Sequence, residues 1–208
     1  IKWSLVYYYR GDFREQVDVL NSCKYLAESI DNKNRLGMFY AWYGFSLLFR
    51  ERLKESRDYL LKALEIGEEN EDQQVIGYAC TWLSWTCSEL GLLKEAILYG
   101  ERGQEIAKQN PSDQYLFFKS LGGIGYASFY RGDKKRTLEA GTAILDYGQT
   151  HSNIRSIVLG YFITGIAYIT DGSYQKAIDA FLNAIQTAAD PYYAQFPIFS
   201  MGAVYALS

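Results

Sequence analysis

Few residues in this chain have the types and the spacing that catalysis requires. His151 is the only histidine among 208 residues and lies in a turn-rich segment, so a nucleophile-histidine pair would depend on one loop side chain. Gly122, Gly123 and Gly125 are glycine-rich like a phosphate-binding loop, but they lie inside a helical pattern with no strand before it. No GxxxxGK[ST] sequence occurs either. We therefore expect no enzymatic activity.

The possible metal ligands are equally dispersed. Cys23, Cys80 and Cys87 are an odd number of cysteines without CxxC spacing, and they do not combine with one histidine into a zinc set. The acidic run between Glu65 and Asp72 lacks the alternation of a calcium-binding loop. We expect no metal and no cofactor, and we interpret the cysteines as small buried residues in a reducing compartment.

The charge balance disfavours two classes of partner. The chain has 21 Lys and Arg against 24 Asp and Glu, a net charge of −3, so no global positive field attracts nucleic acid or an anionic membrane. The uncharged segment 156–170 is too short to span a bilayer, and 191–208 contains Pro191, Pro197 and Gln195. We expect a cytoplasmic protein that binds neither nucleic acid nor membrane.

Small residues recur along the chain with a period of about forty. Gly11, Gly91, Gly132 and Gly172 are 80, 41 and 40 residues apart, and Glu51 occupies the missing position. A second series of small residues lies inside the predicted first helices. Twelve positions after each of them, in the predicted second helix, is a partner residue that is small or medium-sized. The first members are Ser4, Gly44, Ser84, Gly125 and Gly165, and their partners are Gln16, Ser56, Ala96, Thr137 and Ala177.

This pattern predicts an all-α protein of antiparallel helix pairs, because helical periodicity alternates with glycine turns and strand-like alternation is absent. A mid-helix glycine costs about 0.5–1 kcal/mol relative to alanine, so its recurrence indicates close helix packing. The first helices are predicted at 1–9, 34–50, 73–90, 113–130, 153–170 and 191–208, and the second helices at 13–30, 53–68, 93–109, 134–149 and 174–188. Residues 1–208 would form one array of five pairs plus a first helix, a fragment of a longer chain.

The best-matched unit runs from Tyr161 to Ala184. Its residues Tyr161, Gly165, Tyr168, Ala177, Phe181 and Ala184 resemble, in order, the pattern of the tetratricopeptide repeat (TPR). The resemblance implies a right-handed α-α superhelix. The period of forty exceeds the 34 residues common in that family, and it resembles the long repeats of bacterial signalling ATPases, maltose-activator-like regulators and nucleotide cyclases.

The resemblance also implies that the first helices line a concave groove. The positions projected onto that groove are aromatic: Trp42, Phe45, Phe49, Trp82, Trp85, Tyr126, Phe129 and Tyr130. An aromatic stripe is typical of a packed core as well as of a binding surface, and both interpretations remain open. We expect an interaction or regulatory scaffold that binds a protein segment or a neighbouring domain of the parent chain. The alternative is a sensor that binds a small molecule or short peptide and signals to an attached effector.

Overall fold

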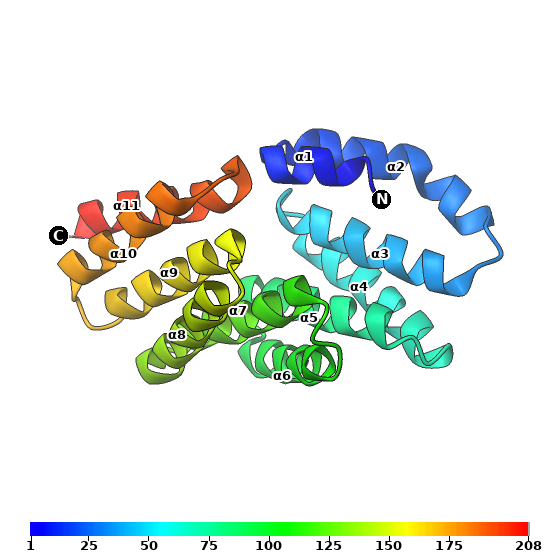
Figure 1. Cartoon of the computed structure of the whole chain (residues 1–208). Coiled ribbons are helices and arrows are strands. Elements are labelled where there is room, and N and C mark those ends of the chain that lie inside the picture. The colour runs from blue at the N-terminus through cyan, green and yellow to red at the C-terminus, as the bar shows by residue number, and fades with distance from the viewer. Residues whose placement is uncertain (208) are drawn as a thin grey trace. The chain divides into compact units, whose positions relative to one another are not determined.

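The computed structural model describes residues 1–207, which form eleven α-helices and contain no β-strand (Figure 1). The predicted all-α class is therefore confirmed, while Ser208, which the sequence places in the last helix, lies outside the described residues. The helices are α1 (Ser4–Arg10), α2 (Phe13–Ser29), α3 (Lys33–Leu48), α4 (Leu53–Glu69), α5 (Gln73–Glu89), α6 (Leu93–Gln109), α7 (Gln114–Tyr130), α8 (Lys134–Thr150), α9 (Ile154–Ile169), α10 (Tyr174–Thr187) and α11 (Pro191–Leu207).

Successive helices pack against each other as pairs. The second helix of a pair also contacts the first helix of the next, as α4 contacts α5 and α8 contacts α9. The chain divides into two compact units, Ile1–Ser120 and a second unit that begins at Leu121, so that α7 contributes residues to both. Each unit is described separately below. The single array predicted from the sequence stays a prediction.

The turns inside the pairs share one backbone conformation. Gly11, Gly91, Gly132 and Gly172 have positive φ values of 72° to 77°, and Glu51, at the missing position of the glycine series, has φ of 57°. A left-handed conformation is strained for any residue with a Cβ atom. The turn geometry therefore persists at Glu51 although glycine is absent there.

Side-chain caps fix where several first helices begin. The side-chain oxygens of Asn32, Asp72 and Asn153 accept hydrogen bonds from the backbone N–H groups of residues two or three positions further on. Asp113 and Asp190 cap α7 and α11 in the same way. Each cap satisfies an N–H group that has no partner within its helix. These five helices begin within one residue of the starts that the sequence predicts.

The paired helices approach each other at small residues. A Cβ atom added to Gly44 of α3 would lie 2.7 Å from Leu60 Cγ of α4, and one added to Gly125 of α7 would lie 3.0 Å from Ala140 Cβ of α8. At Gly165 an added Cβ would overlap the Phe181 ring. All ten residues of the two paired series are buried. Close packing at these positions explains why the helices tolerate internal glycine and serine.

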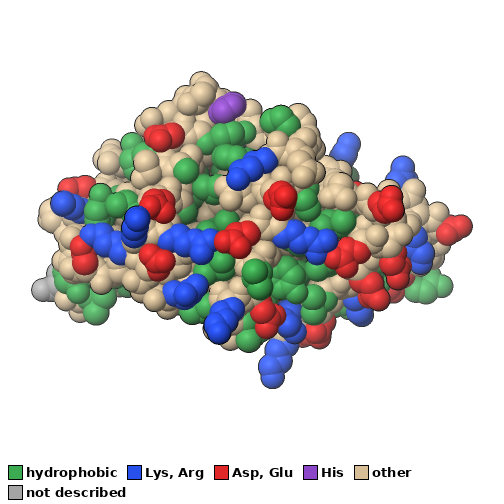
Figure 2. All heavy atoms as spheres, turned by 90° about the horizontal axis from the view of Figure 1, so that it is seen from below, with side chains coloured by type: hydrophobic (Ala, Val, Ile, Leu, Met, Phe, Trp, Pro, Cys, Tyr) green, Lys and Arg blue, Asp and Glu red, His purple; other side chains and the backbone are tan. Residues whose placement is uncertain are grey.

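Ion pairs connect neighbouring second helices on the surface. Arg57 of α4 contacts Glu95 of α6 at 2.9 Å, and Arg102 of α6 contacts Glu68 of α4 at 2.6 Å. Figure 2 shows Lys, Arg, Asp and Glu side chains interspersed over one face rather than segregated by sign. Because these side chains are partly exposed, each pair contributes about 0–1 kcal/mol to stability.

Glu51→Gly should raise the free energy of unfolding by about 0.5–1 kcal/mol, because glycine adopts the left-handed conformation without steric strain. Gly91→Ala, at the equivalent turn with φ of 74°, should lower it by about 1 kcal/mol. Urea denaturation followed by circular dichroism measures both changes. A less stable Glu51→Gly protein would show that the Glu51 side chain compensates for its own strain.

Candidate binding site

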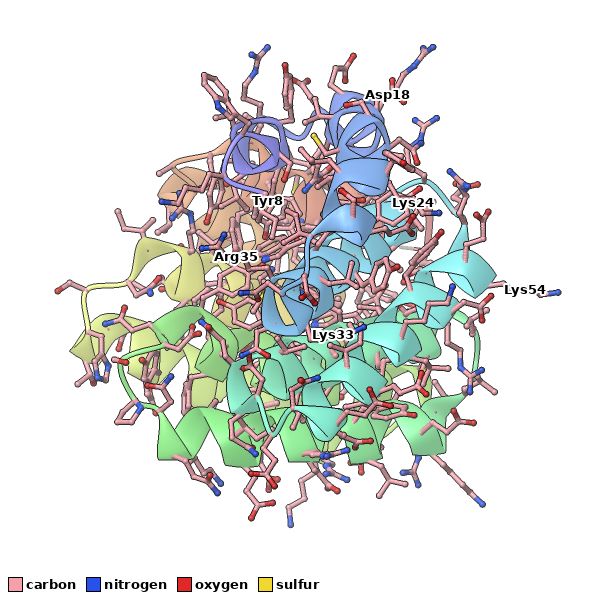
Figure 3. The ribbon with its side chains drawn as sticks, turned by 90° about the vertical axis from the view of Figure 1, so that its right-hand side faces the viewer. Tyr8, Asp18, Lys24, Lys33, Arg35 and Lys54 are labelled. Carbon is pink, nitrogen blue, oxygen red and sulfur yellow. The ribbon has the colours of Figure 1, made fainter. Side chains whose placement is uncertain are left out.

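The interior of the first unit contains a column of four side chains from four successive first helices. The rings of Tyr8 (α1) and Phe45 (α3) lie edge to face with centroids 5.3 Å apart, and Phe45 stacks on Trp82 (α5) at 3.6 Å. The Nζ atom of Lys119 (α7) lies 5.7 Å from the centroid of the Trp82 ring. We call Tyr8, Phe45, Trp82 and Lys119 the central stack. Figure 3 shows Tyr8 among the interior side chains, whereas Lys54 extends outward.

The central stack follows a spacing of its own. Its members are at positions 8, 45, 82 and 119, which are 37 residues apart, whereas the turn glycines repeat every 40 or 41. The three-residue difference is about one turn of helix, so each first helix is displaced by about one turn relative to the preceding one. Residues that touch across neighbouring repeats therefore recur every 37 residues, whereas the turn glycines recur every 40 or 41.

A second row of rings lies beside the central stack. The Trp42 ring is 5.9 Å from Tyr78 and 6.0 Å from Tyr115, and Tyr78 stacks on Tyr115 at 5.9 Å. The hydroxyl groups of Tyr8 and Tyr115 are 3.2 Å apart and share a hydrogen bond that joins α1 to α7. Burial, with the Asp113 carboxylate nearby, raises the pKa of Tyr78 well above its ordinary value. Rings from four helices thus fill the interior of this unit.

Lys119 places a positive charge within this aromatic interior. Its side chain is only 2% exposed, and its Nζ atom lies 5.7 Å from the Trp85 ring and 5.8 Å from the Tyr115 ring. Such contacts between a cation and the faces of aromatic rings stabilise the charge by about 0.5–2 kcal/mol each. Trp85 Nε1 donates a hydrogen bond of 3.0 Å to the Lys119 carbonyl. The aromatic surroundings partly compensate for the loss of hydration.

The sequence analysis missed Lys119, Tyr78 and Tyr115. Lys119 is the only charged residue between Gln114 and Tyr130, so an isolated charge within an apolar helix was the available signal. The regular interval of 37 residues was a second signal. The turn glycines do not reveal this interval, because they repeat every 40 or 41 residues, whereas the residues that touch across repeats lie 37 apart.

The structure places the predicted groove residues at different depths. Trp42, Phe45 and Trp82 are buried, which places these three rings in the packed core. Phe49 and Trp85 of the first unit are half-buried, as are Tyr126 and Phe129 of the second, and Tyr130 is 46% exposed. The stripe therefore contains core residues and surface residues, and only the second group could contact a partner without rearrangement of the core.

The surface rings of the second unit gather at the end of α7. Tyr126 and Tyr130 are one turn apart, with ring centroids separated by 5.0 Å and hydroxyl groups separated by 3.1 Å. The Phe129 ring lies 5.5 Å from that of Tyr130, and the Tyr126 ring lies 6.4 Å from Phe162 of α9. We call Tyr126, Phe129 and Tyr130 the α7 ring group.

The groups that could supply a nucleophile or a base have ordinary structural surroundings. His151 is exposed at the C-terminal end of α8, where its ring stacks on Tyr147 at 4.1 Å. Burial raises the pKa of Cys80 to about 12 and also raises the pKa of Cys87. Cys23 is exposed, so the expectation of three buried cysteines was wrong for this residue. Among residues 1–207 no three His, Cys, Asp or Glu side chains are grouped as metal ligands.

Comparisons with known proteins place the fold. No protein-family model matches the chain, and no curated protein matches it. A solved structure of BtubC (BKLC) from P. vanneervenii is 16% identical, with a TM-score of 0.67 over 88% of this chain and 76% of that one. TPR-like repeats of a putative kinesin light chain from Podosopora anserina are 14% identical, with a TM-score of 0.61 over 89% and 92%.

A Rap protein complexed with competence and sporulation factor has a TM-score of 0.79 at 14% identity, over 98% of this chain. Apo RapI matches 98% of this chain with a TM-score of 0.61 and 16% identity. The chain spans 63% of the length of the first of these proteins and 60% of the second. At such identities the similarity shows the fold alone, and that fold is a TPR-like solenoid of helix pairs. Among residues 1–207, none of the helices combines the length and the apolar composition that a membrane span requires.

Trp82→Ala should lower the free energy of unfolding by about 3–5 kcal/mol, because it removes the ring between Phe45 and Lys119 in the central stack and leaves a cavity. Trp3→Ala is the matched control: Trp3 is 79% exposed, so its loss should change stability by less than about 0.5 kcal/mol. Urea denaturation measures both. If both variants lose the same free energy of unfolding, the central stack stabilises the fold no more than an exposed ring does.

In the folded protein, only Cys23 should react with Ellman's reagent at pH 8. The thiolate is the reactive form, and burial keeps the Cys80 thiol protonated at this pH because it raises the pKa to about 12. Titration in buffer should therefore give one fast thiol, and titration in denaturant should give three. Cys23→Ser should abolish the fast phase. Rapid reaction of a second thiol in buffer would contradict the buried placement.

Proposed function

We propose that this chain is a non-catalytic interaction module that binds a protein segment through aromatic side chains of its first helices. The observation that carries the proposal is the α7 ring group, whose three rings lie together at the end of one helix with Tyr130 46% exposed. Tyrosine and phenylalanine anchors contribute much of the affinity of protein interfaces because they bury a large area at a small entropic cost.

The partner that fits these rings is a segment with apolar or proline-rich side chains. Ring faces favour such groups, and the phenol hydroxyls of Tyr126 and Tyr130 can still exchange hydrogen bonds with a backbone. A neighbouring domain of the parent chain could supply the segment as well as a separate protein. Both sources are consistent with a cytoplasmic location, which stays part of the proposal.

A second candidate is a sensor of short peptides. The Rap protein similar in fold is complexed with competence and sporulation factor, which makes a peptide-sized ligand a reasonable hypothesis for this chain too. A pocket of about 210 Å³ lies in the first unit, lined by Gln73, Gln74, Ile106, Gln109, Asn110 and Leu116. It is smaller than the roughly 300–1,000 Å³ of most small-molecule sites, so it would enclose a single side chain of such a peptide and not the whole ligand.

Replacement of half-buried Phe129 and exposed Tyr130 should weaken binding without unfolding the protein. Peptides selected from a displayed random library against the wild-type chain should bind the double variant Phe129→Ala, Tyr130→Ala at least about tenfold more weakly. The matched control, Phe49→Ala, Trp85→Ala, changes two half-buried rings of the first unit. Isothermal titration calorimetry measures affinity, and circular dichroism checks that each variant is folded.

The outcomes separate the two candidates. If both double variants bind selected peptides as the wild type does, the aromatic rings are not the binding surface. Loss of affinity in the control variant alone would assign binding to the first unit. A short peptide that raises the melting temperature in proportion to its concentration, as binding to the native state requires, would favour the sensor.

A further inference from the structure

Positive charge is concentrated at one edge of the second unit. The sequence from Leu121 onward contains six Lys and Arg residues, and five of them lie in the turns after α7 and α9 or in the first turn of the helix that follows: Arg131, Lys134, Lys135, Arg136 and Lys176. The same segments contain only two acidic residues, Asp133 and Asp171, so their net charge is +3, whereas that of the whole chain is −3. Charge segregated in this way attracts ligands of the opposite sign.

The two turns lie side by side. Lys134, at the start of α8, forms an ion pair with Asp171 in the turn after α9. Its Nζ atom is 5.5 Å from the centroid of the Tyr168 ring, and the Nζ atom of Lys176, in the first turn of α10, is 5.8 Å from the same centroid. These contacts join the basic residues of both turns into one surface.

These positions are unfavourable for lysine and arginine. The N-terminal end of an α-helix carries a partial positive charge, so acidic residues stabilise it and basic residues destabilise it. The first turn of α8 contains Lys134, Lys135 and Arg136 and no acidic residue, and the first turn of α10 contains Lys176 and no acidic residue. Basic residues that lower helix stability point to a use outside the fold, and an anionic partner supplies one.

Three of these cations remain available to a partner. Arg131 and Lys176 are exposed, and within residues 1–207 neither side chain forms a hydrogen bond or an ion pair. Lys135 lies 3.9 Å from Glu139, but both side chains are more than half exposed, so solvent weakens that pair. We call Arg131, Lys135 and Lys176 the basic edge.

The basic edge begins where the α7 ring group ends. Tyr130 is the last residue of α7, and the backbone N–H of Arg131 still donates a hydrogen bond of 3.2 Å to the Ala127 carbonyl, as the next residue of the helix would. The helix that follows in sequence, α8, already packs against α7 where Gly125 faces Ala140. This surface therefore lies within the described fold and is not an end face on which a further repeat would stack.

The geometry points to an acidic segment of a partner protein as the occupant of this surface: we propose that its carboxylates pair with the basic edge while an adjacent apolar or aromatic side chain contacts the α7 ring group. Such binding rests on the function proposed above and specifies the chemistry of the bound segment. The Arg131 guanidinium can hold a carboxylate through two hydrogen bonds. A nucleic acid fits less well, because its continuous phosphate backbone would also meet the carboxylates of Asp133 and Asp171, which separate acidic side chains can avoid.

Peptides selected from a displayed random library against the wild-type chain should be enriched in Asp and Glu next to Phe, Tyr, Trp or Pro, relative to the unselected library. The double variant Arg131→Glu, Lys176→Glu should bind these peptides at least about tenfold more weakly in isothermal titration calorimetry, because like charges then face each other. Raising the NaCl concentration from about 0.1 M to about 0.5 M should also weaken binding by the wild type, since salt screens exposed charges.

The matched control is Lys54→Glu, Lys108→Glu, which makes the same change in net charge at two exposed lysines of the first unit. It should bind the selected peptides as the wild type does, so that an effect of overall charge is separated from an effect of the basic edge. Both double variants should melt close to the temperature of the wild type, because none of the four side chains forms an ion pair within residues 1–207.

The outcomes distinguish this proposal from the function on which it rests. If Arg131→Glu, Lys176→Glu binds the peptides as the wild type does while Phe129→Ala, Tyr130→Ala does not, the interaction function stands and the acidic segment is excluded. If neither variant loses affinity, both proposals fail. Selected peptides without acidic enrichment, or equal weakening in the lysine control, would overturn the basic edge alone. Tighter binding of single-stranded oligouridine than of the peptides, lost in the charge-reversed variant, would assign the edge to nucleic acid and overturn the proposal.

Discussion

The structure depends on the close contact between the two helices of each pair, made where one helix has a residue with almost no side chain. At Gly44 and Gly165 the partner contributes Leu60 and Phe181, which occupy the space a Cβ atom would take. The loss of helix propensity at glycine, about 0.5–1 kcal/mol, is offset by the contact area that the close approach permits. Because the apolar faces of the two helices must meet at this short distance, the close approach also fixes where the other side chains of each pair lie.

The central stack is one consequence of that arrangement. Once the pairs are formed, first helices lie next to first helices, and a side chain on each reaches the interior at intervals of 37 residues. Tyr8, Phe45 and Trp82 fill the interior with rings instead of the aliphatic side chains that a core of this size could also use. Rings also accommodate the charge of Lys119, because their faces are weakly negative. An aliphatic interior would leave that ammonium group with less compensation for its lost hydration.

The sequence predicted those features that a local pattern determines. Turn glycines, capping residues and the paired small residues act within one or two helical turns, so the helices and their pairing could be derived, and the left-handed turn extends even to Glu51. The burial of each aromatic ring was not predictable from the sequence, because it depends on which residues of other repeats pack against that ring. Trp42 and Trp85 look alike in sequence, yet one is buried and the other half-buried. Cys23 shows the same limit, since the sequence analysis expected it to be buried and it is exposed.

The division between buried and exposed rings also bears on how such a scaffold can acquire a partner. The buried rings contact one another so extensively that a change in one alters the packing of several, which restricts what they can bind. The residues of the α7 ring group are half-buried or exposed, so they can change at less cost to the fold than the buried rings. In a helix-pair scaffold, the packing glycines and the central stack therefore maintain the structure, and the exposed rings are the positions at which we propose recognition.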